Sequence, residues 1–545
     1  MKFDRKYSPL LALLLILAIG IFLRIYRFDE WVRFNDDQAR DATLIRDVLS
    51  GHKPLPLLGP VAAGTRFHLG PAFYYFQYAA GSVFGETPDH LAYPDLFLSI
   101  LAIPTLFLFL RKCFSDRISL AVTAIAAVSA FAVGYSRFAW NPNSLPFFVL
   151  LFLYSLVELE TRDRKREFAF SILAGLSLGI GIQLHALFLF IAPFVLLAFF
   201  SFGIRKNHRL WKPAAILLSA ALAVNLPQIV SEVGTHGRNT RALVSGITAK
   251  SDTVSSVGEY ILINGVCQVR NNAMIVSSFG ELQNCHLAGF REQLRTERTS
   301  FGNMGRAIAL SGLLLGIIFT VGGYGLLFTR ARRETDEKRK RALSLVSLYA
   351  AIASVVFIPF ATVMTSRYFL VIEFVPFFFL ALWFEYAAKR FGKFALTLTV
   401  TAVIVLAFLN LRSVSTTFAS YDGAHPERVE APESVTLSDI RSIAAHIRER
   451  TGSADTVYVD DRSGDTFGMM KGLAYFLDPA GIKVKQLNKG TDLPKDASVF
   501  SIDLAKVSPE EEIVVEPASR RQLASYTITD HATFGRFTVF GFGQR

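Results

Sequence analysis

The sequence carries little charge for its length. Only 19% of its 545 residues are Asp, Glu, Lys or Arg, whereas soluble domains carry about 25%. The shortage lies in one part of the chain, because apolar blocks of membrane-spanning length follow one another up to about residue 412. A chain of this length is expected to hold more than one domain. The sequence therefore predicts a polytopic α-helical membrane domain over residues 1–412 and a soluble α/β domain over residues 413–545.

Cysteine is also scarce, with three residues in the whole chain. Three cysteines exclude a small fold held together by disulfides. Cys113 falls in a predicted cytoplasmic loop. Cys267 and Cys285 fall in one predicted external loop, where an oxidising compartment permits a disulfide. The sequence leaves open whether these two are bonded.

The basic surplus does not indicate a nucleic-acid partner. The formal net charge is +12, but most of the excess Lys and Arg lies in short loops between apolar blocks. Such loops set the orientation of membrane proteins, because basic loops stay in the cytoplasm. The chain also lacks a glycine fingerprint for nucleotides and a His, Cys and Asp cluster with metal-ligand spacing.

About eleven apolar blocks approach the roughly 20 residues that cross a bilayer. Every even-numbered span ends in a basic loop, and the N-terminus is basic too, which places the N-terminus in the cytoplasm of a cell-membrane protein. The first block lacks a small-residue cleavage site, so we interpret it as an uncleaved span. The predicted spans are 8–27, 91–110, 117–135, 144–160, 168–184, 186–203, 213–231, 304–329, 342–363, 367–386 and 393–412.

The same orientation places the C-terminal domain and the longest loops outside the cytoplasm. Residues 70–85 are apolar but short and rich in aromatic residues, so we predict a re-entrant or interfacial helix on the outer side. In the C-terminal domain, spacing and composition predict two helices and three short strands. The predicted external loops are 28–90, 136–143, 232–303 and 364–366; the domain's helices are 436–450 and 469–477, and its strands 456–459, 497–502 and 536–542.

The first external loop holds the strongest candidates for chemistry. A helix is expected to begin near Asp37, with Asn35 or Asp36 as its N-cap and Gly51 beyond its end. Asp36 and Asp37 could simply stabilise the start of this helix. One of them could instead face a cavity as a general base. Only one can face the substrate directly, since adjacent helical residues point about 100° apart.

A long first external loop that opens with an acidic pair resembles the GT-C glycosyltransferases, which include the protein O-mannosyltransferases and the lipid A aminoarabinose transferases. Three further segments are similar to theirs: FHLGPAFYYF at 67–76, YSRFAWNPNSLPFFVLL at 135–151 and TSRYFLVIEFVP at 365–376. A block of seven spans followed by a large external loop and an external α/β domain also fits. The resemblance covers most of the chain.

The sequence departs from that family pattern at three positions. Asp37 stands where Glu is commoner, His68 where Lys is frequent, and Asn143 where Asp is frequent. These departures concern the identity of the sugar and of the acceptor more than the class of reaction.

The resemblance implies transfer of a sugar from a polyprenyl-phosphate donor, drawn from the membrane lipid, to an acceptor hydroxyl on the outer face, with inversion. Such a reaction needs a base near the hydroxyl and cations near the departing phosphate. Asp37 is the first choice for the base and Asp36 the second. A glycan, a lipid and a protein remain open as acceptor. A divalent cation, Mg²⁺ or Mn²⁺, held by either carboxylate and the donor phosphate also remains open.

Six residues are candidates for substrate binding. Arg367 lies at the outer mouth of a span, against the orientation bias, and could hold the phosphate or only anchor the span. Arg40 is one turn from the acidic pair and could instead form a local ion pair. A polar residue such as His185 at the end of a span suggests function or a satisfied structural role. The candidates are Arg40, His68, Arg137, His185, Arg367 and Tyr368.

Three other functions compete with this prediction. A transporter or flippase for lipid-linked glycans would also need many spans, but such proteins often contain internal repeats, and none is evident. An O-antigen-type polymerase or ligase would share the lipid-linked substrate, yet an acidic pair so soon after the first span is not expected there. An assembly protein could use the C-terminal domain to bind partners, and the role of that domain remains open.

Overall fold

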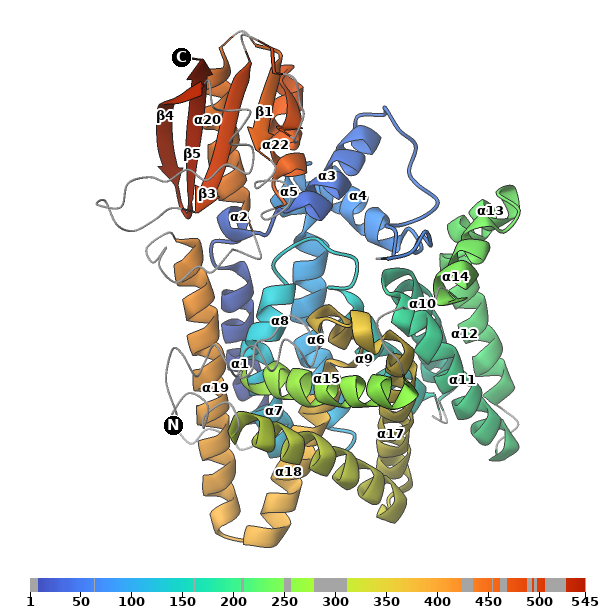
Figure 1. The fold of residues 1–545 in the computed structure, drawn as a ribbon. Coiled ribbons are helices and arrows are strands. Elements are labelled where there is room, and N and C mark those ends of the chain that lie inside the picture. Colours follow the sequence, from blue (N-terminus) through green and yellow to red (C-terminus); the bar gives the residue numbers. More distant parts are fainter. Residues whose placement is uncertain are drawn as a thin grey trace.

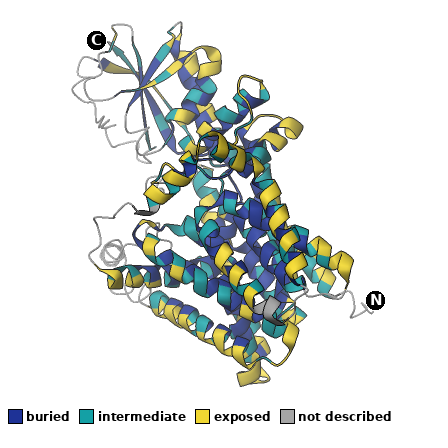
Figure 2. Ribbon diagram, turned by 90° about the vertical axis from the view of Figure 1, so that its right-hand side faces the viewer, coloured by how far each residue is buried: buried dark blue, intermediate teal, exposed yellow. Residues whose placement is uncertain are grey.

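The structure is a computed structural model in which a helical bundle carries a small α/β domain at one end (Figure 1). Figure 2 shows that buried residues fill the middle of the bundle while exposed residues cover its outer faces. The structure describes residues 8–62, 64–159, 163–206, 210–248, 256–278, 311–422, 435–452, 454–460, 468–487, 493–494, 497–504 and 526–544.

Each predicted span coincides with a helix or with a helix that is broken by a bend. Two of the bends are 62°, one between α12 and α13 and one between η3 and α18. The helices are α1 (Ser8–Ile25), α6 (Tyr93–Leu110), α7 (Asp116–Val128) with α8 (Ala130–Tyr135), α9 (Leu145–Glu158), α10 (Arg164–Leu184), α11 (Ala186–Lys206), α12 (Trp211–Val224) with α13 (Leu226–Gly234), the helix Ser311–Arg333, α17 (Glu337–Phe357) with η2 (Ile358–Val363), η3 (Ser366–Ile372) with α18 (Phe374–Phe391), and α19 (Phe394–Tyr421).

The chain is a multi-pass membrane protein, but the predicted count of eleven spans is not confirmed. Within the described residues, five helices are long and apolar enough to cross a bilayer, and seven are if each bent pair counts as one span. Breaks explain part of the difference: Ser129 separates α7 from α8, and Asn225 precedes Pro227 at the bend before α13. Large apolar side chains stay exposed along α19, including Phe394 and Phe408, as expected for a surface that faces lipid.

Helices lie in the described parts of the two longest predicted external loops, and all are short except α15, which has 21 residues and packs within the bundle (Figure 1). The helix predicted near Asp37 is α3; the Asn35 N–H donates to the Gln38 side chain at 3.1 Å, and Gly51 beyond its end has a φ of +78°. A 13-residue helix, α4, occupies the predicted interfacial segment. Cys267 is disulfide-bonded, and Cys285 lies outside the described residues. These helices are α2 (Phe28–Trp31), α3 (Asp36–Leu49), α4 (Ala72–Phe84), α5 (Pro88–Leu91), α14 (Arg238–Thr248) and α15 (Val257–Ser277).

The C-terminal domain is a five-stranded sheet in the order β2-β1-β3-β5-β4. Its first three strands are parallel, and β5 and β4 are antiparallel. The sequence missed β2 and β4, because these edge strands are largely exposed and lack a run of apolar residues. The elements are α20 (Leu437–Thr451), β1 (Thr456–Asp460), α22 (Met470–Leu477), β2 (Lys483–Leu487), β3 (Ser498–Leu504), β4 (Tyr526–Phe534) and β5 (Phe537–Gln544).

The first external loop is joined to the C-terminal domain through backbone hydrogen bonds. The Phe34 N–H donates to the Val435 carbonyl at 2.8 Å, and the Leu437 N–H donates to the Val32 carbonyl at 2.9 Å. The loop and the domain therefore lie at the same end of the bundle, which we call the outer end. The turn between α18 and α19 lies at the opposite end (Figure 1).

Candidate functional site

A cavity of about 500 Å³ opens at the outer end of the bundle, and we call it the outer cavity. Its walls come from the first external loop, α8 and the segment after it, the start of η3, and the last turns of α19. None of the described residues that line it is acidic, while three are arginines: Arg33, Arg137 and Arg367. The cavity is therefore electropositive and suited to an anion.

Two of these arginines pack against a cluster of aromatic rings made of Tyr135, Phe138 and Trp140. The Arg33 guanidinium lies 5.0 Å from the centre of the Phe138 ring, and that of Arg367 lies 5.4 Å from the centre of the Trp140 ring. The Phe138 and Trp140 rings are 5.7 Å apart. Contact with a ring face holds a guanidinium while leaving its N–H groups to bind an anion. Both side chains lack a hydrogen-bonded or ionic partner among the described residues.

Arg137, the third arginine, is already engaged. It donates to the carbonyls of Arg24 and Tyr26 at 2.8 Å, and to those of Leu23 and Arg27 at 3.3 and 3.4 Å. The carbonyls of Leu23 and Arg24 lie in the last turn of α1, where a helix leaves carbonyls without a backbone partner, and those of Tyr26 and Arg27 follow it. Burial lowers the pKa of Arg137 to about 10. Its hydrogen bonds make Arg137 a cap for α1 that adds positive charge to the cavity wall.

Arg40 is held by carboxylates of its own helix. It donates to both oxygens of Asp41, at 2.9 and 3.1 Å, and to Asp37 at 2.9 Å. Asp41 is 1% exposed and also accepts a hydrogen bond from the Tyr74 hydroxyl at 3.0 Å. This is the local ion pair that the sequence left open, and Arg40 does not line the outer cavity.

The two predicted carboxylates diverge. Asp36 accepts the N–H of Lys471 at 2.9 Å, so its carboxylate meets the start of α22 in the C-terminal domain. Burial raises the pKa of Asp36, and the hydrogen bond from Lys471 opposes this shift. The Asp37 side chain is 53% exposed. Neither residue lines the outer cavity.

The remaining candidates, His185, Tyr368 and His68, lie in two separate parts of the structure. The His185 ring lies 5.6 Å from the ring of Tyr368, nearly perpendicular to it, so both lie beside Arg367. His68 lies elsewhere, in a hairpin: Asn239 on α14 accepts its N–H at 2.7 Å and donates to its carbonyl at 2.8 Å. The structure therefore brings together Arg367, Tyr368 and His185, and keeps His68 apart.

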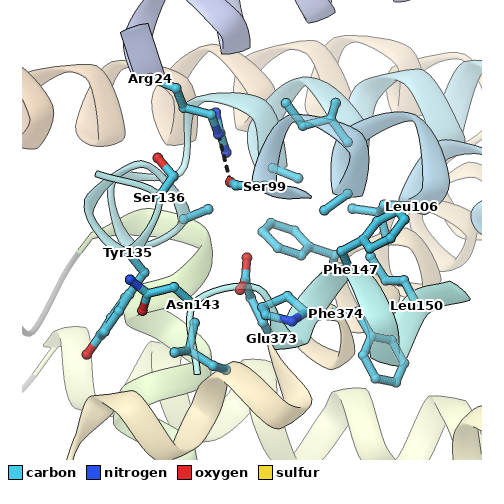
Figure 3. Close-up of a pocket in the computed structure, with 17 residues that line it drawn as sticks. Arg24, Ser99, Leu106, Tyr135, Ser136, Asn143, Phe147, Leu150, Glu373 and Phe374 are labelled. Carbon is cyan, nitrogen blue, oxygen red and sulfur yellow. Dashed lines mark hydrogen bonds between the residues drawn. The ribbon is translucent and has the colours of Figure 1, made fainter. Parts of the chain in front are cut away.

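A second, smaller cavity of about 40 Å³ lies within the bundle (Figure 3), and we call it the inner cavity. Arg24 and Glu373 point into it from opposite sides. Arg24 is 1% exposed and donates to the Ser99 hydroxyl at 2.9 Å. Tyr135 lines both cavities, and Asn143 lines the inner one with a side-chain oxygen that has no partner among the described residues. A cavity this size holds a few water molecules.

The sequence analysis missed Arg33, Arg24 and Glu373. Arg33 carried the same signal that selected Arg367, a basic residue on the outer side against the orientation bias. Arg24 and Glu373 are charged residues inside or at the start of predicted spans, which by itself suggests a function.

The described residues include no group of three or more His, Cys, Asp or Glu side chains arranged to hold a metal ion. The divalent cation considered for Asp36 or Asp37 would need further ligands from the donor phosphate and water. It stays a prediction.

Comparisons with known proteins agree with this architecture. Residues 68–230 match the sequence model of the family described as dolichyl-phosphate-mannose-protein mannosyltransferase. No protein of curated function matches the chain in sequence. Two crystal structures of ArnT from Cupriavidus metallidurans superpose on nearly the whole chain at 11% identity. The apo form covers 98% of this chain and 97% of its own, with a TM-score of 0.53. The form bound to undecaprenyl phosphate covers 99% and 98%, with a TM-score of 0.54. The chain therefore has the fold of the GT-C membrane glycosyltransferases, as the resemblance predicted.

Proposed function

We propose that this protein transfers a sugar from a polyprenyl-phosphate donor to an acceptor hydroxyl at the outer end of the bundle. The observation that carries the proposal is the pair Arg33 and Arg367, two guanidinium groups with free donors that face one cavity with no acidic residue in its described lining. A guanidinium matches the geometry of phosphate oxygens and is the usual partner of a phosphate in proteins. The ArnT structure with undecaprenyl phosphate supports a lipid phosphate as ligand of this fold.

The reaction needs one base and one stabilised leaving group. The acceptor oxygen forms a bond to the anomeric carbon while the bond from that carbon to the phosphate oxygen breaks. In a single displacement this inverts the anomeric centre. Arg33 and Arg367 would stabilise the departing polyprenyl phosphate, because they bind the additional charge that develops on it. Asp37 keeps the proposed role of the base that takes the hydroxyl proton.

Asp37 does not line the cavity, whereas Trp31 and Arg33 of the same loop do, so the Asp37 side chain would have to move to reach a substrate bound there. Among the described residues, the Asp37 side chain is held only by an exposed ion pair with Arg40, whereas Asp36 accepts the backbone N–H of Lys471. This difference favours Asp37 over Asp36 as the base. We further propose that the outer end faces away from the cytoplasm, in agreement with the basic loops of the sequence.

The test is incubation of the purified protein with a panel of polyprenyl-phosphate sugars and candidate acceptors. We expect release of free polyprenyl phosphate, detected by mass spectrometry, with one of these donors. A transporter or flippase would instead move labelled lipid across a vesicle without breaking the bond to phosphate. Movement without any release, across the whole panel, would contradict the proposal. Treatment with EDTA, followed by Mg²⁺ or Mn²⁺, tests the predicted cation in the same assay.

A further inference from the structure

Two oppositely charged residues face each other inside the bundle, away from the proposed site of chemistry. The guanidinium of Arg24 and the carboxylate of Glu373 point into the inner cavity from opposite sides and interact electrostatically (Figure 3). Among the described residues that line the two cavities, Glu373 is the only acid. Charged groups at this depth are costly, so those that are present usually serve a function.

Glu373 lies at the end of the short helix that carries Arg367. Arg367 is the second residue of η3, and Glu373 follows its last residue. The body of this helix is fixed, because residues 369–372 are buried and the Tyr349 hydroxyl donates to the Val371 carbonyl at 2.8 Å. Glu373 and Arg367 therefore lie at the two ends of one packed helical segment.

Arg24 has the same relation to Arg33. It lies in the last turn of α1, and the chain from there to Arg33 is held by Arg137. Arg137 donates to the carbonyls of Arg24 and Tyr26, and its own carbonyl accepts the Arg33 N–H at 3.3 Å. Each member of the inner pair thus lies on the segment that carries one of the outer-cavity arginines.

We infer that Arg24 and Glu373 are positioning residues whose attraction across the inner cavity sets the separation of Arg33 and Arg367. This inference rests on the proposed function, in which those two arginines bind the phosphate of the lipid donor. The attraction acts across the cavity, and it is screened less than in bulk water because the surrounding bundle is apolar and the cavity admits only a few water molecules. Losing it lets the two segments move relative to one another, and the arginines no longer converge on one phosphate.

The experiment compares Arg24→Gln, Glu373→Gln and the double variant in lipid nanodiscs. The probe is undecaprenyl phosphate, and the measurements are its Kd and the thermal unfolding temperature. Each single variant is expected to bind about tenfold or more weakly, since small misplacements of binding groups have large effects. Each is also expected to unfold earlier, because it leaves one buried charge without its partner.

The double variant separates positioning from stability. Neutralising both groups removes the uncompensated charge, so its unfolding temperature should return towards that of the wild type. Its Kd should stay about tenfold weaker, because the attraction is still missing. Arg111→Gln is the matched control. It removes an exposed arginine that is paired with Asp116 and lines neither cavity, and it should change neither measurement.

Two results would overturn the inference. A double variant that regains both stability and wild-type affinity would show that the pair only stabilises the fold. Single variants that bind undecaprenyl phosphate as the wild type does would show no coupling at all. Failure of the wild type itself to bind the lipid would instead refute the proposed function, and the inference with it, so the two failures are distinguishable.

Discussion

Basic residues at the two ends of the bundle differ in their partners, although Arg40 at the outer end is also paired with carboxylates. At the end away from the C-terminal domain, Glu385 accepts from Arg330 at 2.9 Å, from Arg339 at 2.7 Å and from Lys389 at 3.1 Å. At the outer end, Arg33 and Arg367 contact aromatic rings and have no carboxylate partner among the residues that the structure describes. Cations that are neutralised within the protein hold helices together. Cations that face a cavity without a counter-ion are available to a ligand.

The largest loss of activity is expected when the arginines of the outer end that lack an ion pair among the described residues are replaced. Replacing Arg367 or Arg33 with Gln removes a cation from the departing phosphate, which should lower the rate of polyprenyl-phosphate release about 100-fold or more. The unfolding temperature should change little, because among the described residues both arginines have ring contacts to lose but no hydrogen-bonded or ionic partner of the side chain. The measurement is release of polyprenyl phosphate under saturating donor. Variants that keep the wild-type rate would remove both residues from the proposed site.

An intermediate effect concerns the two carboxylates of the first external loop. Asp37→Asn should lower the turnover rate about 100-fold while leaving donor affinity unchanged, as expected for loss of a general base. Asp36→Asn should mainly weaken the contact with α22, at about 1 kcal/mol for a helix N-terminal contact of this kind. Rates, donor affinity and unfolding temperature are measured on both. If only Asp36→Asn loses turnover, Asp36 and not Asp37 is the general base.

The smallest effect on activity is expected at the opposite end. Glu385→Gln leaves three cations without their carboxylate, and should lower the free energy of unfolding by roughly 1–3 kcal/mol. It should leave the turnover rate at the wild-type level, because Glu385 lines neither cavity. Thermal unfolding and the release assay are run side by side. A loss of turnover without a loss of stability would contradict the contrast between the two ends.

Much of the architecture could be predicted from the sequence, because burial in a membrane leaves a simple pattern. Apolar blocks of about 20 residues and basic loops predicted where helices lie, and each predicted span has a helical counterpart. The helix at Asp37 was predicted from its cap and its terminal glycine. The exposed strands β2 and β4 were missed because an edge strand needs no apolar run.

The site was only partly predictable, because contacts between distant segments decide which charges are free. The sequence predicted substrate binding for both Arg40 and Arg367. In the structure, Arg40 forms an ion pair with Asp41, whereas Arg367 contacts an aromatic ring and has no ion pair among the described residues. Arg33 lies only four residues before Asp37, yet no local sequence pattern shows that it faces the outer cavity. Its importance depends on Phe138, more than a hundred residues away in the chain.

The sequence alone determined that the chain spans a membrane many times and ends in an α/β domain. Hydrophobicity and loop charge are local properties, and they act on each segment independently of the others. Tertiary structure decided which arginines face a cavity and which are paired within the protein. That distinction depends on the distance between groups far apart in the chain, and no local pattern encodes such a distance.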